Sequence, residues 1–229
     1  MLKVHHLVRS QSQRIVWLCE ELEIPYDLVI HLRDPATNLP AGGLKAVHPL
    51  GLAPVIEDGA LVLSESGAIV EYLIDRHGQG RLRPSPEHPD RAQFLHWFHF
   101  ANANLQAGFG RTMFFERAGV PRDNPIHTML RARLAASLAY MDVRLAEVPY
   151  LAGETFTAAD IMAAVTLGTM RTHARTLACA AGCIATPRVP RIAARSSGAT
   201  PDLNRCWIEP HCADMRYELA DDERLPDAG

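Results

Sequence analysis

The spacing of hydrophobic and polar residues follows two different patterns along this chain, and the pattern changes near residue 80. Two short apolar runs, at 2–8 and 26–32, are typical of buried strands. Between them an apolar stripe recurs at helix spacing, formed by Ile15, Leu18, Cys19 and Leu22. We predict that Arg14 and the nearby glutamates lie on the other faces of this helix. A strand–helix–strand order favours a parallel pair of strands joined by a right-handed crossover.

A hairpin and a further helix are predicted next. Two strands, at 54–57 and 60–63, flank Asp58-Gly59. Asp-Gly between apolar runs is a strong hairpin signal, because both turn residues then adopt positive φ. Apolar residues at helix spacing mark the helix that follows, namely Ile69, Val70, Leu73 and Ile74. Gly78 is expected at the C′ position of that helix.

A proline-rich stretch at 81–88 reads as a linker, and every long segment beyond it has helix periodicity. One apolar stripe contains Phe94, Trp97, Phe98, Ala101 and Leu105, and another contains Leu130, Leu134, Leu138, Met141 and Leu145. The predicted organisation is therefore an α/β unit at 1–80, the linker, an all-α domain at 89–172 and a tail of unusual composition at 173–229.

The start of one helix in the second domain carries a capping signal. Thr157 stands three residues before Asp160, which favours two reciprocal hydrogen bonds. The Thr157 hydroxyl would accept the Asp160 N–H, and the Asp160 carboxylate would accept the Thr157 N–H. Phe156 and Ile161 occupy the positions of a hydrophobic staple. This signal supports the fold and carries no chemistry.

Composition narrows the class of protein. The chain has 229 residues, of which 48% are hydrophobic and 21% charged, with a net charge of -3. Such values are ordinary for a globular protein and favour neither nucleic acid nor an anionic membrane as a partner. No apolar run approaches a membrane span, and the early polar residues argue against a signal peptide, so a cytoplasmic location is expected. Five cysteines in a chain of this length make a disulfide framework improbable.

Four short motifs, in this order, resemble those of serine-type glutathione transferases. Residues 7–18 read LVRSQSQRIVWL, 48–55 read HPLGLAPV, 64–66 read SES and 157–161 read TAADI. The resemblance covers about residues 1–172. It implies a thioredoxin-like N-terminal domain that binds glutathione, followed by an all-α C-terminal domain.

The resemblance assigns the thiol chemistry to Ser10, at the end of the first strand. There a hydroxyl would donate a hydrogen bond to the sulfur of glutathione and stabilise the thiolate. Ser12 is the rival hydroxyl and is expected to act only as a helix cap. No tyrosine or cysteine stands beside Ser10, and Cys19 lies on the apolar stripe, where a core position is expected.

The remaining binding residues also follow from the resemblance. Pro54 is predicted to be a cis-proline that turns the Val55 backbone toward the cysteinyl part of glutathione. Ser66 would hold the γ-glutamyl carboxylate at a helix N-terminus, and Glu65 would hold the ammonium. Relatives often carry Lys or Gln two residues before the cis-proline, where this chain has Leu52. Lys45 or His48 are the substitutes to consider for binding the glycyl carboxylate.

The implied activity is conjugation of glutathione, the co-substrate, to small hydrophobic electrophiles, a detoxification reaction, in a homodimer. Candidates for the electrophile site are Phe100, Asn104, Met113 and Phe114. Two alternatives stay open. One is another glutathione-dependent enzyme on this fold, such as a peroxidase, isomerase or dehalogenase. The other is a catalytically silent binding module.

The tail at 173–229 breaks the pattern. It holds seven arginines, four cysteines and no lysine, without helix periodicity. A zinc site could be drawn from His173, Cys179, Cys183, Cys206, His211 and Cys212, but their spacing fits no compact zinc module, so no metal is assigned. We favour a shift of reading frame near Thr172, which would leave a disordered tail.

Overall fold

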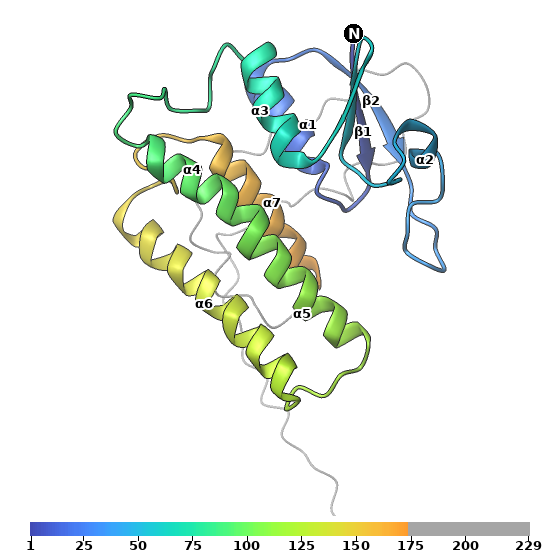
Figure 1. Cartoon of the computed structure of the whole chain (residues 1–229), viewed down its shortest axis with the longest axis vertical. Coiled ribbons are helices and arrows are strands. Elements are labelled where there is room, and N and C mark those ends of the chain that lie inside the picture. Colours follow the sequence, from blue (N-terminus) through green and yellow to red (C-terminus); the bar gives the residue numbers. More distant parts are fainter. Residues whose placement is uncertain (174–229) are drawn as a thin grey trace, which may run out of the picture.

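A computed structural model describes residues 1–173 of the chain, with side chains described up to Met170. An α/β unit occupies one end of the molecule and a set of long helices occupies the other (Figure 1). This arrangement confirms the predicted order of a strand-rich half followed by an all-helical half. The predictions for the tail and for the zinc ligands lie outside the described residues.

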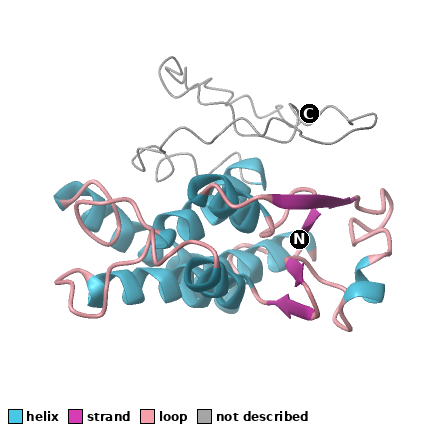
Figure 2. Cartoon of the chain, turned by 90° about the horizontal axis from the view of Figure 1, so that it is seen from above, coloured by secondary structure: helices cyan, strands magenta, loops and turns pink. Residues whose placement is uncertain are grey.

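A four-stranded mixed sheet forms the core of the first half, in the order β2-β1-β3-β4. The strands are β1 (Leu2–Leu7), β2 (Tyr26–His31), β3 (Val55–Asp58) and β4 (Leu61–Ser64). The first two are parallel, with Leu2 opposite Tyr26, as the strand–helix–strand pattern predicts. Strand β3 runs antiparallel to both of its neighbours. Figure 2 shows the strands gathered at one end of the molecule, beside the helical layer.

The hairpin between β3 and β4 lies one residue later than predicted. Asp58 pairs with Leu61, so the two turn residues are Gly59 and Ala60. Gly59 has φ 62°, whereas Ala60 is not among the residues with positive φ. A glycine at the first central position is the requirement of a type II′ turn, which matches the twist of the strands as well as the predicted type does.

Two helices of the first half pack on the sheet and on each other. Helix α1 spans Gln13–Leu22 and helix α3 spans Ser66–Arg76, while α2 is a single turn at Leu44–Val47. The predicted stripes of α1 and α3 are buried, and Cys19 is fully buried as expected. Gly78 follows α3 at C′, but a Cβ there would lie 2.8 Å from a Leu22 methyl. Close packing of the two helices therefore explains this glycine.

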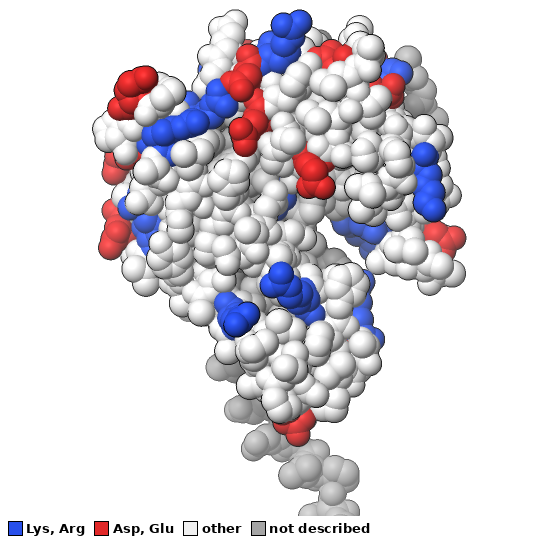
Figure 3. Space-filling view, viewed as in Figure 1, with Lys and Arg blue, Asp and Glu red and all other residues white. Residues whose placement is uncertain are grey.

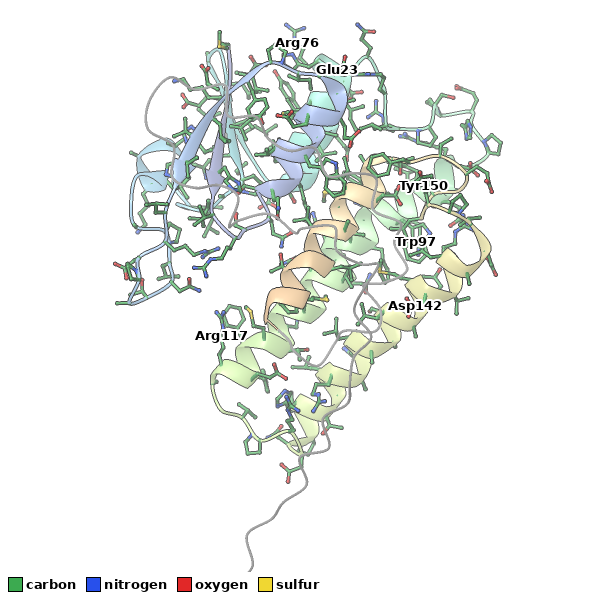
Figure 4. The ribbon with its side chains drawn as sticks, turned by 180° about the vertical axis from the view of Figure 1, so that it is seen from behind. Glu23, Arg76, Trp97, Arg117, Asp142 and Tyr150 are labelled. Carbon is green, nitrogen blue, oxygen red and sulfur yellow. The ribbon has the colours of Figure 1, made fainter. Side chains whose placement is uncertain are left out.

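The second half begins with a nearly continuous helical run. Helix α4 (Arg91–Phe100) passes through a π-helical segment, η1 (Ala101–Gln106), into α5 (Ala107–Arg117). The predicted stripe from Phe94 to Leu105 is buried throughout. Trp97 stacks on Tyr140 with 4.9 Å between ring centroids, and Figure 4 shows it on the side of α4 that faces α6. The core of the helical half thus forms along the stripe read from the sequence.

Helices α6 (Pro125–Glu147) and α7 (Ala158–His173) complete the described bundle. Asn124 caps α6 by accepting the backbone N–H groups of Ile126 and His127. Helix α7 packs against α4 and η1 on one side and against α1 on the other. It therefore joins the two halves. Across residues 1–173, no helix has both the length and the apolar character required to cross a membrane.

The capping prediction for α7 is confirmed in one of its two bonds. The Asp160 carboxylate accepts the Thr157 N–H at 2.9 Å, as predicted, and also the Leu151 N–H at 2.8 Å. The Thr157 hydroxyl accepts the N–H of Ala159, while the Asp160 N–H goes to the Thr157 carbonyl. The second bond differs because the Thr157 hydroxyl also donates to the Asp160 carboxylate, which turns it away from the predicted partner.

Candidate active site

A cavity of about 310 Å³ lies where the two halves meet. The α/β half contributes most of its wall, through Gln11, Arg14, His48, Leu50, Leu52, Ala53, Pro54, Ser64, Glu65 and Ser66. The helical half contributes Asn102 and Gln106, both from the π-helical segment. A π-turn inside a helix often marks a functional position, and here it faces the cavity. Figure 3 shows the surface hollowed between the two halves, with basic side chains along the hollow.

Arg14 is a buried cation at the wall of this cavity. Its side chain is 1% exposed, and within residues 1–173 no carboxylate pairs with it. One terminal nitrogen donates to Ser66 at 3.1 Å and to Asn102 at 2.6 Å, and the other donates to Thr166 at 2.6 Å. Its Nε has no partner in the described part of the chain. Burial lowers the pKa of Arg14 to about 9.

The burial of Arg14 corrects the prediction that it lies on an outer face of α1. The helix is buried on the side that faces α7, and Arg14 reaches across to Thr166 on that helix. A buried charge without a counter-ion is costly, so it is retained in proteins where it meets a ligand or holds a network. A second buried polar atom, the Oε1 of Gln11, also lacks a hydrogen-bond partner within the described residues.

The start of α3 presents Ser66 and Glu65 to the same cavity. The Ser66 hydroxyl accepts hydrogen bonds from Arg14 and from the Asn102 amide, and its side chain is almost fully buried. Glu65 precedes the helix with φ 72°, a strained value for a residue with a side chain, while its side chain remains exposed. Strain of this kind gathers at ligand sites, and here it sets the carboxylate beside the first turn of α3.

The Ser10 hydroxyl belongs to a chain of polar groups at the junction of β1 and α1. It lies 2.7 Å from the Ser12 hydroxyl and accepts the Ser12 N–H at 3.2 Å. The Ser12 hydroxyl lies 2.9 Å from the Nδ1 of His6 and accepts the Leu7 N–H at 3.1 Å. Ser12 occupies the N-cap of α1, but its hydroxyl makes no cap bond, which corrects the expectation of a pure cap. Ser10 itself is partly exposed and does not line the cavity, whereas Gln11 beside it does.

The loop before β3 forms another wall. The Ala53–Pro54 peptide is cis, as predicted, and both of its residues line the cavity. Val55, the residue predicted to contact glutathione, is fully buried and lies opposite His5 on one side and Ser64 on the other. Val55 is not among the residues that line the cavity, whereas Ala53 and Pro54, just before it, are.

Of Lys45 and His48, the two residues considered for the glycyl carboxylate contact that Leu52 cannot make, one reaches the cavity. Leu52 is 59% exposed at the wall. His48 lines it too and lies 3.2 Å from the Ser64 hydroxyl through its Nε2. Lys45 is exposed on α2 and is not part of the wall. The structure therefore brings His48 to the site and leaves Lys45 outside it.

None of the predicted electrophile residues, Phe100, Asn104, Met113 and Phe114, is among the residues that line this cavity. Phe100 packs into the aromatic cluster with Trp97 and Tyr140, and Met113 packs against the core. Phe114 is 65% exposed on α5.

In the described part of the chain, no group of three or more His, Cys, Asp or Glu could hold a metal ion. Burial raises the pKa of the Cys19 thiol, which fits its place in the core.

Several residues that line the cavity were given no role from the sequence, among them Arg14, Asn102 and Gln106. A signal existed for Arg14, since it directly precedes the unbroken apolar run from Ile15 to Cys19. No local signal marks the other two, because their role depends on how the helical half docks against α3.

Comparison with known proteins gives one consistent family. The sequence pattern of the Glutathione S-transferase N-terminal domain matches residues 9–76, and that of the Glutathione S-transferase C-terminal domain matches residues 115–181. Glutathione S-transferase 3 of Schizosaccharomyces pombe is 34% identical over 173 residues, which cover 70% of each chain. Glutathione S-transferase GstB of Escherichia coli strain K12 is 34% identical over 157 residues, 66% of this chain and 74% of that relative.

Solved structures agree with the sequence comparison. A glutathione S-transferase from Actinobacillus pleuropneumoniae superposes with a TM-score of 0.70 at 27% identity, covering 76% of this chain and 80% of its own. A theta class glutathione S-transferase from Xanthomonas axonopodis pv. citri, solved with glutathione bound, gives a TM-score of 0.54 at 29% identity, covering 71% and 79%. The predicted thioredoxin-like half followed by a helical half is thereby confirmed.

Proposed function

This chain belongs to the glutathione S-transferase family and is a glutathione transferase, and from that premise we propose that the cavity holds glutathione while Ser10 activates its thiol. The observation that carries the proposal is the buried, unpaired Arg14 beside Ser66 at the start of α3. A cation without a counter-ion, at a helix N-terminus that faces a cavity, is suited to a carboxylate.

The γ-glutamyl end of glutathione would occupy this part of the cavity. Its carboxylate would accept hydrogen bonds from the Ser66 hydroxyl and backbone N–H, with the Arg14 charge behind them. Its ammonium would pair with Glu65, whose carboxylate has no hydrogen-bond partner or ion pair of its own within residues 1–173. The zwitterionic end of the ligand thus meets one cation and one anion of the chain.

The thiol of glutathione would be held as thiolate by the Ser10 hydroxyl. A free thiol has a pKa of about 8.5, and lowering it by two units requires about 2.7 kcal/mol. A hydrogen bond to a charged acceptor contributes roughly 1.5–3 kcal/mol. The N-terminus of α1, which follows Ser10, adds about 0.3–1 kcal/mol. The two effects together suffice without a general base.

The middle and far ends of glutathione would meet the loop before β3. The cis peptide Ala53–Pro54, which lines the cavity, would turn the Val55 backbone toward the cysteinyl part of glutathione. His48 would contact the glycyl carboxylate, because Leu52 stands at the position where relatives often carry a Lys or Gln. Because an imidazole is a weaker anchor than an ammonium, we expect modest affinity for glutathione.

The thiolate would then attack an electrophilic carbon of a small hydrophobic compound, in keeping with a detoxification role. The exposed Phe114 supports an apolar second site on α5. We further propose a homodimer, supported by the exposed Leu61 and Val62 of the edge strand β4, since apolar residues on a sheet edge favour association. Sedimentation of the purified chain tests the dimer directly.

The experiment that tests the proposed function is a calorimetric titration with glutathione, together with turnover of a generic aryl halide. Glu65→Gln should abolish measurable binding, while Glu71→Gln, an exposed change on the same helix, should not. Ser10→Ala should largely keep binding and lose turnover at least tenfold, while Ser137→Ala on α6 should behave as the wild type.

A folded wild-type chain that binds no glutathione would refute the proposed site. Binding without turnover would refute the thiol activation and leave the silent binding module as the better account.

A further inference from the structure

The hydroxyl proposed to activate glutathione is not isolated. Ser10, Ser12 and His6 form a continuous chain of polar atoms, with 2.7 Å between the two hydroxyls and 2.9 Å between Ser12 and the His6 Nδ1. The chain runs from β1 across the junction to the start of α1, and its hydrogens can be arranged in two directions. The direction decides whether Ser10 has a proton to offer the sulfur.

In the outward arrangement every group of the chain is satisfied. The Ser12 hydroxyl accepts the Leu7 N–H and an Nδ1–H of His6, which fills both of its lone pairs, so it cannot also accept from Ser10. It donates to Ser10 at 2.7 Å, the nearer acceptor, while the Leu7 carbonyl lies at 3.3 Å. Ser10 then accepts from both the N–H and the hydroxyl of Ser12. Within residues 1–173, the Ser10 O–H then has no acceptor left among its printed contacts and is free to donate outward to a thiolate.

In the inward arrangement the Ser10 hydroxyl donates its proton to Ser12 and has none to offer the ligand. If the His6 Nδ1 carries no proton, it accepts the Ser12 O–H. Ser12 then accepts from Ser10, whose only proton is turned away from the ligand. The thiolate loses its donor, although no heavy atom has moved.

We propose that His6 is a positioning residue for thiol activation, because an Nδ1–H tautomer of His6 orients the two hydroxyls so that Ser10 donates outward. This inference rests on the proposed role of Ser10. It requires no change of charge at His6 during the reaction, since the imidazole acts as a fixed donor. No bond to a heavy atom is made or broken at His6 or Ser12.

The surroundings of His6 favour a neutral ring. Burial, and to a smaller extent the neighbouring His31, lower its pKa to about 4. His31 is in turn 2.9 Å from the Nδ1 of His5, and His5 contacts Glu57. A neutral imidazole holds one proton on one of its two nitrogens, so the tautomer is a real choice that the network can settle.

The test compares two substitutions of nearly equal shape. An asparagine at position 6 can place an N–H where the Nδ1 of histidine lies, whereas a leucine cannot. The readout is the pKa of the thiol of bound glutathione, followed by thiolate absorbance and by the pH profile of kcat/KM. His6→Leu should raise that pKa by about one unit, as expected for one lost hydrogen bond. His6→Asn should stay near the wild type, and the affinity for glutathione should change less than twofold in both.

Two further variants separate this inference from the proposed function. Ser10→Ala alone should raise the thiol pKa, and adding His6→Leu to it should have no further effect, because the hydroxyl that His6 orients is gone. If Ser10→Ala leaves the pKa unchanged, the proposed function fails. If Ser10→Ala raises it and His6→Leu does not, the role of His6 alone is overturned.

A direct measurement covers the case in which His6→Leu does not fold. Nitrogen-15 shifts of the histidine rings in the wild-type protein, with glutathione bound, distinguish a protonated Nδ1 from a protonated Nε2. An Nδ1–H tautomer at His6 is the expected result. An Nε2–H tautomer with an unprotonated Nδ1 would overturn the proposal.

Discussion

At the scale of the residue, Arg14 combines a structural cost with a proposed function. Its guanidinium is removed from water and joins three oxygen atoms, of Ser66, Asn102 and Thr166, yet none of them carries a negative charge. The Nε remains without a partner within residues 1–173. A ligand carboxylate would supply the missing charge, so the free protein should be less stable at this point than the liganded one.

Arg14→Met tests this balance. Methionine keeps an unbranched, mainly apolar side chain and removes the charge, so the affinity for glutathione should fall roughly 10- to 100-fold, the range for a lost charged hydrogen bond. The unliganded protein should also lose melting temperature, because Ser66, Asn102 and Thr166 are left without the buried donor that joins them. Calorimetry and thermal unfolding measure the two effects. Unchanged affinity would contradict the role of Arg14.

His6 makes a separate prediction about pH. Its pKa in the folded protein, about 4, lies below the ordinary value of 6.5. Between these two values the unfolded chain binds more protons than the folded one, so stability falls as pH drops through that window and is constant for this residue above it. His6→Asn should lose less stability than the wild type between pH 7 and 4, by urea unfolding. Parallel pH curves for the two proteins would show that His6 is not protected from protonation.

The residues of the site differ in how far the sequence could reveal them. The neighbourhood of Ser10, Pro54, Glu65 and Ser66 follows from short motifs whose geometry is local. That Ala53 lines the cavity while Val55 is buried in the sheet depends on how the strands pack, which no motif records. Arg14 was misplaced because a polar residue is normally assigned to the solvent side of a helix, and only the docking of α7 shows otherwise.

At the scale of the element, two helices of the helical half, α6 and α7, begin in different ways. Helix α6 begins at the solvent-facing Asn124, with Pro125 in its first turn. Helix α7 begins in the interior, where Asp160 accepts backbone N–H groups from Leu151 and Thr157 as well as the Thr157 hydroxyl. Asp160 therefore fixes both the helix and the loop before it.

The two caps should differ in their contribution to stability. Asn124→Ala removes an exposed cap and should cost about 1 kcal/mol. Asp160→Ala leaves two buried N–H groups without a partner, each worth about 1–3 kcal/mol, so we expect a loss of about 3 kcal/mol. Denaturant unfolding of both variants measures the difference. Equal losses would mean that water reaches the N–H groups near Leu151.

Elements were read from the sequence more reliably than their ends and turns. The apolar stripes from Phe94 to Leu105 and from Leu134 to Met141 identify helices of the bundle. A helix needs apolar residues at helix spacing on its buried face, whichever element it packs against. The π-helical segment inside the first stripe leaves no trace in the spacing of its apolar residues. The hairpin was displaced by one residue because Asp58 pairs with Leu61 and leaves Gly59 to open the turn.

At the scale of the whole molecule, the proposed glutathione site belongs to both halves. Gln11, Arg14 and Ser66 come from the α/β half, and Asn102 and Gln106 come from the helical half. The same contact surface includes Trp17 of α1, which packs on Phe156 with 6.1 Å between ring centroids. A ligand held by both halves should therefore stabilise them together.

Two tryptophans allow this coupling to be measured. Trp17 is buried in α1 and Trp97 in α4, so each reports on one half. A third tryptophan, Trp207, lies outside the described residues and would be replaced by phenylalanine throughout. Trp17→Phe and Trp97→Phe then give two proteins with a single probe each.

In urea, the tryptophan fluorescence of each single-probe protein should give the same midpoint as its loss of helix measured by circular dichroism, because α7 and the network around Arg14 join the halves. Saturating glutathione, at 100 times its Kd, should raise the free energy of unfolding by about 2.7 kcal/mol at either probe. Separate midpoints would mean that the halves unfold independently. A shift seen only at Trp17 would mean that glutathione contacts the α/β half alone, and that Asn102 and Gln106 border the cavity without contributing to binding.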